Sequence, residues 1–168
     1  MSGARRIRAA VGIALGGALV LAVHAPISAA QVGTTHLDVF AVEGPFEKDI
    51  DVGKPGFPTA GDYAVESQPI LDPADGSSIG RSLSELTIVR PVSDGQDFEV
   101  VLDSTLRLSD GDLVLDGGLR FSEFFEGGAI AVVGGTGTFA GARGTAAFTA
   151  GTVAGKEGFL LSIDIVTA

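Results

Sequence analysis

Short runs of alternating apolar and polar residues, separated by turn-forming residues, constrain the fold of this chain most strongly. In residues 98–108, Phe98, Val100 and Leu102 share one face, and mostly charged or polar residues lie between them. A period of two residues is typical of β-strands, and no segment shows a helical period. Comparable runs occupy residues 34–42, 62–71, 79–90, 113–122, 129–133, 145–150 and 159–166. The sequence therefore predicts an all-β fold with eight strands.

The connections between these runs indicate how the strands pair. Three of them contain Asp-Gly, at Asp75-Gly76, Asp94-Gly95 and Asp110-Gly111. This dipeptide accommodates the positive φ angles of tight hairpins, so consecutive strands are expected to pair antiparallel. Closure into an eight-stranded antiparallel β-barrel removes exposed strand edges and is the predicted architecture. A β-sandwich of two sheets is the alternative. Residues 43–61 are rich in proline and glycine and are predicted to form a long loop.

The first thirty residues have the composition of a signal peptide. Arg5, Arg6 and Arg8 precede an apolar segment at residues 9–23, and Ala29-Ala30 ends a cleavage site of small residues. We therefore expect export, cleavage near Ala30 and a secreted protein with no membrane span after cleavage. An uncleaved membrane anchor is the alternative, although the apolar run of roughly 15 residues is shorter than the ~20 that a spanning helix needs.

Residues 31–168 are predicted to form one domain. Removal of the three leader arginines leaves 8 Lys and Arg against 21 Asp and Glu, a net charge of −13. So acidic a chain is not expected to bind nucleic acid, because binding to phosphates needs clustered basic residues. There is no cysteine, and His36 is the one histidine of this domain. Disulfides, thiol nucleophiles and multi-histidine metal sites are therefore excluded, and we expect no cofactor and no metal.

Two motifs suggest enzymes of other folds but occur in the wrong context. Residues 131–144, AVVGGTGTFAGARG, contain G-x-G-x-x-A, the pattern of dinucleotide-binding turns. Gly141 and Gly144 interrupt the helix that such a site needs, and no further βα units follow. Residues 76–80 match G-x-S-x-G, but a nucleophile elbow needs a following helix and a later histidine. Both segments are better interpreted as turns.

The glycine-rich stretch instead resembles a known signature. Residues 132–139, VVGGTGTF, followed by ARG at residues 142–144, resemble the V-V-G-G-T-G-x-F-x-x-A-R-G signature of plant dirigent proteins and the related glycine motif of allene oxide cyclases. Residues 62–90 and 98–122 also follow the cyclase strand order. The resemblance implies an eight-stranded barrel, usually a homotrimer, whose hydrophobic cavity steers reactive organic intermediates by confinement and without a cofactor.

Polar residues at strand positions are the candidates for such a cavity, because charges on strands either face solvent or line an interior. The resemblance places Asp38 near the first-strand acid of both families, and Asp38 is the predicted catalytic residue. Gln68 falls where the cyclases keep an asparagine, and Arg120 lies near the position of a dirigent arginine. With Arg107, these two are the predicted ligand-binding residues. The strand-borne polar residues are Asp38, Glu66, Gln68, Arg81, Glu85, Asp103, Arg107, Asp116, Arg120 and Asp164.

The resemblance also implies what this chain lacks. The cavity cysteine of the cyclases aligns near Leu86 and their cavity tyrosine near Leu119, so a true allene oxide cyclase is not expected. The leading hypothesis is an exported barrel that binds a small hydrophobic or phenolic molecule and controls its cyclisation or coupling, with isomerase- or cyclase-type chemistry if a reaction occurs. A non-catalytic carrier or cell-envelope interaction protein is the alternative. An open cavity of roughly 300 Å³ or more that contains Asp38 would favour the first.

Overall fold

The computed structural model describes residues 33–53, 58–92 and 97–167. The predicted signal peptide and the Asp94-Gly95 turn lie outside these residues. The described chain is built of strands, a four-residue α-helix, α1 (Glu123–Glu126), and a 3₁₀ turn, η1 (Gly137–Phe139). In these ranges no helix has the length and apolar character that a membrane crossing requires. The strands are β1 (Gly33–Val42), β2 (Lys48–Ile50), β3 (Tyr63–Leu71), β4 (Ser78–Pro91), β5 (Phe98–Leu108), β6 (Gly111–Arg120), β7 (Ala129–Gly135), β8 (Arg143–Val153) and β9 (Lys156–Thr167).

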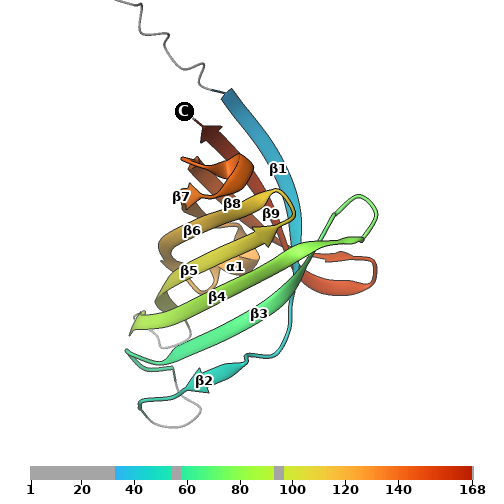
Figure 1. Ribbon diagram of the computed structural model, residues 1–168. Helices are drawn as coiled ribbons and strands as arrows, with labels where there is room; N and C mark the ends of the chain where they lie inside the picture. Colours follow the sequence, from blue (N-terminus) through green and yellow to red (C-terminus); the bar gives the residue numbers. More distant parts are fainter. Residues whose placement is uncertain (1–32, 54–57, 93–96, 168) are drawn as a thin grey trace, which may run out of the picture.

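Eight of these strands close into an antiparallel barrel (Figure 1). From β3 to β9 each strand pairs with the next, and the full length of β1 pairs with β9. The barrel closes where β1 also pairs with the end of β3, at Phe40↔Leu71 and Ala41↔Ile70. The predicted eight-stranded barrel is therefore confirmed, and the sandwich alternative is excluded.

One strand was not expected. β2 lies inside the segment predicted to be a loop, and it pairs with the first half of β3, at Lys48↔Val65 and Ile50↔Tyr63. After Val42 the chain leaves β3, so the first half of β3 would otherwise present unpaired N–H and C=O groups. β2 covers this edge. Three residues are too few to show an alternating pattern, which explains why the sequence did not reveal the strand.

The glycine-rich stretch forms the connection between β7 and β8, which packs against the β5–β6 hairpin. The Thr136 N–H donates to the Asp112 carbonyl at 2.8 Å, and the Asp112 N–H donates to Thr136 Oγ1 at 3.0 Å. Gly137 has a φ of 58°, and a side chain there would meet the Asp110 carbonyl. No helix of the dinucleotide-binding type follows. The stretch is a structural hairpin, as the sequence predicted.

The barrel interior is packed most completely at one end. Inward-facing residues alternate along each strand, and near η1 they fill the space between the strands. The fully buried apolar side chains there include Leu113, Val132, Ile163 and Ile165. Midway along the barrel, the inward residues of β3, β4 and β5 include Gln68, Ser82 and Ser104, which are polar and mostly small, so the interior between this packed end and α1 is not filled. This difference positions the site described next.

Candidate functional site

A cavity of about 250 Å³ occupies the α1 end of the barrel. Leu106 and Leu115, both fully buried, line it from the side of the packed core. Its volume lies just below the ~300 Å³ at which small-molecule pockets commonly begin, so it suits a small ligand. Its lining consists of Ala41, Glu43, Gly44, Pro45, Phe46, Ala64, Glu66, Gln68, Ser82, Ser84, Leu86, Leu102, Ser104, Leu106, Leu115, Phe121, Phe124, Phe125, Phe148, Phe159 and Leu161.

One wall of the cavity is polar and comes from β3, β4 and β5. Strand register places Glu66 opposite Ser84, and Ser84 opposite Ser104, so the three form a row across the sheet. The Ser84 and Ser104 hydroxyls are 2.8 Å apart, and Gln68 Nε2 donates to Glu66 Oε2 at 2.7 Å. Because alternate residues of a strand share a face, all these side chains point inward.

Glu66 is the ionisable group of this wall. Burial raises the pKa of the Glu66 carboxyl, and the nearby Glu43 carboxylate raises it further. Removal from water disfavours the charged form, and a second negative charge adds to that effect. The proton therefore stays on Glu66 to a higher pH than on an ordinary glutamate. A protonated carboxyl in a cavity can donate a hydrogen bond to a bound molecule.

Ser82, in the row next to Glu66, has a buried hydroxyl without a partner. The residue is only 3% exposed, and its Oγ makes no hydrogen bond within the described part of the chain. Gln68, its cross-strand neighbour, directs its amide to Glu66 instead. Buried polar groups are nearly always hydrogen-bonded, so an unpaired hydroxyl in a cavity wall marks a position where a ligand can bind.

Two serine substitutions on β4 are expected to change stability in opposite directions. Ser82→Ala removes an unpaired buried hydroxyl and should raise the free energy of unfolding by up to about 1 kcal/mol. Ser84→Ala leaves the Ser104 hydroxyl without its partner and should lower the free energy of unfolding by about 1–2 kcal/mol. Urea denaturation of both variants measures the difference. A loss of stability in both would show that the Ser82 hydroxyl has a partner.

The opposite wall is aromatic. Phe124 of α1 packs against Phe148 of β8 and Phe159 of β9, with ring centroids 5.5 and 5.9 Å apart, and Phe121 and Phe125 extend the cluster. Glu123 Oε2 accepts the Arg120 N–H at 2.6 Å, which fixes the start of α1. The short helix thus brings two rings to the mouth of the cavity.

Residues 43–47 connect β1 to β2, and Glu43, Gly44, Pro45 and Phe46 line the cavity; we call this segment the strap. The strap is held at both ends, because the Glu43 N–H donates to the Glu157 carbonyl at 2.9 Å and the Glu47 N–H donates to the Val65 carbonyl at 2.8 Å. Phe46 of the strap also lines a second cavity of about 170 Å³. The two cavities share Phe46, Ala64, Leu86 and Phe121, so these residues form the boundary between them.

Of the four residues predicted for the site, Gln68 lines the cavity and Asp38 does not. Asp38 is 44% exposed on the outside of β1, where its Oδ1 lies 3.2 Å from His36 Nε2. His36 Nδ1 lies 2.8 Å from Asp164 Oδ1. A hydrogen bond to Asp164 and the charge of Asp38 raise the pKa of His36. The expectation that Asp38 lies in the cavity is corrected by strand alternation, since Leu37, Val39 and Ala41 occupy the inward face.

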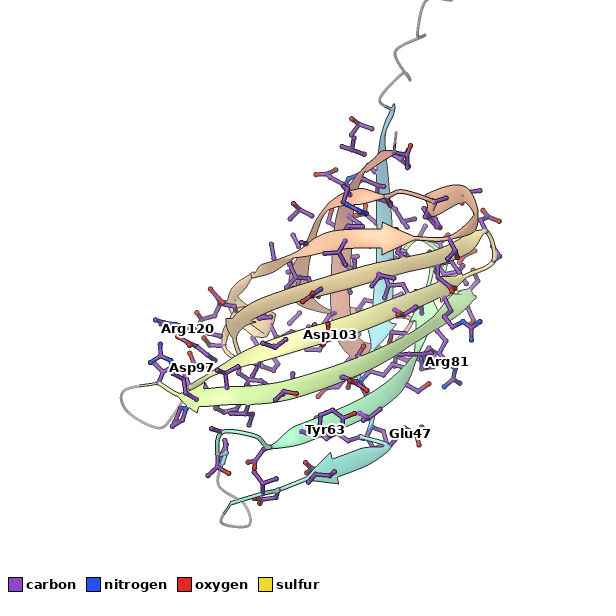
Figure 2. The ribbon with its side chains drawn as sticks, turned by 60° about the vertical axis from the view of Figure 1, so that its left-hand side comes forward. Glu47, Tyr63, Arg81, Asp97, Asp103 and Arg120 are labelled. Carbon is purple, nitrogen blue, oxygen red and sulfur yellow. The ribbon has the colours of Figure 1, made fainter. Side chains whose placement is uncertain are left out.

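The two predicted arginines also lie outside. Arg107 is 63% exposed, with its Nε 3.7 Å from Asp112 Oδ1 on the outer face. Arg120 is exposed at the end of β6 and points away from the barrel (Figure 2). Both arginines alternate with the buried residues of their strands and therefore lie on the outer face of the barrel. Leu86, near the position of the cyclase cysteine, does line the cavity, whereas Leu119 is buried in the core.

Glu66 was among the strand-borne polar residues but was not selected as a site residue. Its spacing of two from Gln68 was the available signal, because residues i and i+2 of a strand share a face. Three serines of the polar wall were also missed, namely Ser82, Ser84 and Ser104. They alternate with exposed residues and share the inward face of β4 and β5 with apolar side chains. The sequence did not single them out because serine is also common on solvent-exposed strand faces. Among the described residues, no group of three or more His, Asp or Glu side chains is arranged to hold a metal ion.

Comparison with solved structures finds this barrel in proteins of low sequence identity. The pterocarpan synthase dirigent protein GePTS1 is 22% identical, with a TM-score of 0.62 over 89% of this chain and 99% of that one. A pyocyanin demethylase is 19% identical, with a TM-score of 0.63 over 77% of this chain and 99% of that one. A nonspecific heme-binding cyclase that catalyses a 4 + 2 cycloaddition is 16% identical, with a TM-score of 0.62 over 82% of this chain and 64% of that one.

No protein-family model matches the chain, and no curated protein matches it. The similarity to dirigent proteins and barrel cyclases is therefore a similarity of fold. This similarity of fold agrees with the resemblance of residues 132–144 to the glycine-rich signature of dirigent proteins.

Proposed function

We propose that this barrel binds a small, hydrophobic aromatic or phenolic molecule and steers its cyclisation or coupling without a cofactor. The observation that carries the proposal is a cavity whose aromatic wall faces a polar wall containing Glu66. Structural neighbours include a pterocarpan synthase dirigent protein and a cyclase, which supports a role of this class. The acid in this proposal is Glu66, which lines the cavity, and not Asp38, which lies outside it.

The two walls have complementary tasks in this proposal. The phenylalanine rings hold a planar apolar molecule, and confinement in a small cavity restricts it to a few conformations, which lowers the entropic part of a reaction barrier. When it carries its proton, the Glu66 carboxyl donates a hydrogen bond to a carbonyl or phenolic oxygen of the molecule and fixes its orientation. Gln68 positions Glu66 through its amide. The free Ser82 hydroxyl offers a second polar contact.

The phenolic probe 2-naphthol tests this arrangement. We expect its affinity to fall as pH rises through the raised pKa of Glu66, because ionisation replaces a hydrogen-bond donor with an acceptor of negative charge. Glu66→Gln keeps a donor and should flatten the profile, whereas Glu66→Ala should weaken binding about tenfold at low pH. Intrinsic fluorescence of the probe reports binding.

An unchanged pH profile in Glu66→Gln would contradict the role of Glu66. Mass spectrometry of small molecules that the purified protein retains then identifies a natural ligand, and product analysis with that ligand separates the two original hypotheses. A changed product distribution supports steering. Retention without conversion would assign the carrier role instead.

Export and a homotrimer are part of the same proposal. The composition of the first thirty residues supports export. Exposed apolar side chains on the outer face, Leu83 of β4, Val101 of β5 and Val133 of β7, support association, since contact between barrels would cover them. Light scattering should give the mass of three chains, and the mass of one chain would contradict the trimer.

A further inference from the structure

The cavity is lined by acidic groups without basic partners. Among its described lining residues, Glu43 and Glu66 are the only ionisable side chains, and none is lysine, arginine or histidine. The adjoining cavity adds Asp49 and Asp62. Both carboxyl groups of the main cavity lie on one side, on the strap and on β3. An anionic ligand would therefore meet two acidic groups and no compensating charge.

The remaining lining favours a positively charged ring. Six aromatic rings line it, those of Phe46, Phe121, Phe124, Phe125, Phe148 and Phe159. The faces of such rings carry negative potential and attract cations, most strongly where water is excluded. Across the cavity, the unpaired Ser82 Oγ is an independent polar group that can turn a lone pair toward positive charge. Its lack of a partner is separate evidence that a ligand completes this wall.

We propose that the cavity selects planar aromatic cations, such as N-alkylated heteroaromatic rings, over neutral and anionic molecules of the same shape. This inference rests on the proposed function in one respect, since both take the cavity as the ligand site. It adds the charge that the bound aromatic molecule carries. A ring with delocalised charge is weakly hydrated and loses little on entering an apolar cavity. A compact ammonium or metal ion is strongly hydrated and pays a larger desolvation cost.

Glu66 provides the counter-charge by releasing its proton. In the empty cavity, burial and Glu43 raise the pKa of Glu66. A bound cation favours the ionised carboxylate and lowers this pKa again. Gln68, which donates to Glu66, and Ser84, its cross-strand neighbour, do not titrate in the working range. Up to the raised pKa of Glu66, cation affinity should therefore increase with pH, the opposite of the trend expected for 2-naphthol, and cation binding in this range should release a proton.

Three probes of similar shape and different charge test the inference: N-methylquinolinium, 1-methylnaphthalene and 1-naphthoate. Calorimetric titration of the purified protein, above the raised pKa of Glu66, should show about tenfold tighter binding of the cation than of the neutral probe, and no measurable binding of the anion. Further titrations between the raised pKa of Glu66 and its lower pKa in the complex, in buffers of different ionisation enthalpy, should detect proton release with the cation alone.

Two variants locate the effect. Glu66→Gln should weaken cation binding about tenfold and abolish proton release while leaving 1-methylnaphthalene binding unchanged. Asp103→Asn removes one carboxylate from the exposed outer face of β5 and should change none of the three affinities (Figure 2). Thermal denaturation checks that both variants are folded.

The outcomes separate this inference from the proposed function. If the neutral probe binds as tightly as the cation, the charge preference is wrong while the cavity remains a ligand site. If Asp103→Asn weakens cation binding as much as Glu66→Gln does, the preference comes from the overall negative charge of the protein and the inference is wrong. If none of the three probes binds, the inference and the proposed function both fail.

Discussion

Replacement of Gly144 with alanine is expected to destabilise the barrel by at least about 3–4 kcal/mol, a large share of the ~5–15 kcal/mol that stabilises a typical domain. Gly144 lies in β8 between β7 and β9, opposite Val132 and Ile165. A Cβ atom there would overlap the backbone carbonyl of Asp164 on β9. Because backbone of a central strand is the obstacle, no side-chain rotation can relieve the clash. The β8–β9 pairing would have to separate locally.

Gly151 supplies a matched control in the same strand. It also lies in β8, and a Cβ atom there would meet nothing within 4 Å. Gly151→Ala should therefore change the free energy of unfolding by no more than about 0.5 kcal/mol, as is usual at exposed positions. Denaturation monitored by circular dichroism measures both variants. Equal stability of the two would contradict a steric role for the glycine of the ARG segment.

Ala64→Phe is expected to weaken binding of small aromatic ligands about a hundredfold or more. Ala64 lies in β3, is 7% exposed, and lines both cavities at their boundary. A phenyl group there would occupy much of a cavity of only about 250 Å³. Since the new side chain enters existing space, the fold should remain and its melting temperature should be unchanged or higher. Fluorescence titration with 2-naphthol and thermal denaturation give the two readouts.

Ala147→Phe is the matched control on the outside of the barrel. Ala147 is exposed in β8, opposite Ala129 and Ser162, so a phenyl group there adds apolar surface without reaching the cavity. Binding should be unchanged. Equal loss of binding in both variants, or full binding by Ala64→Phe, would show that the aromatic molecule binds somewhere other than this cavity.

The strand pattern allowed most of the fold to be predicted. Alternation places inward residues on each strand by local geometry alone, and Asp-Gly at residues 75–76 and 110–111 specifies hairpins because Gly76 and Gly111 have φ angles of 75° and 144°. The glycine-rich stretch was predicted to be a turn, but the steric role of Gly144 within β8 is visible only in the structure. β2 was not predictable, because its three residues pair only in response to the free edge of β3.

The site was less accessible to prediction than the fold. The alternation in β1 already placed Asp38 opposite Leu37, Val39 and Ala41, and the resemblance to barrel families outweighed this local evidence. Glu66 shared a face with Gln68, but nothing in β3 alone distinguishes an inward polar face from one exposed to solvent. The alternation of residues along a strand separates these two acids, because it places Asp38 on the outer face of β1 and Glu66 on the same face as Gln68.

The sequence by itself determined the strands, the hairpins and which residues of each strand share a face, because these depend on neighbours a few positions apart. The tertiary structure alone decided that a cavity remains inside the barrel, that Glu66 lines it together with an unpaired Ser82 hydroxyl, and that six phenylalanines complete its lining. The physical reason is volume. Whether a barrel interior is filled depends on the summed side chains of eight strands at one level, and residues far apart in the chain meet there only after closure.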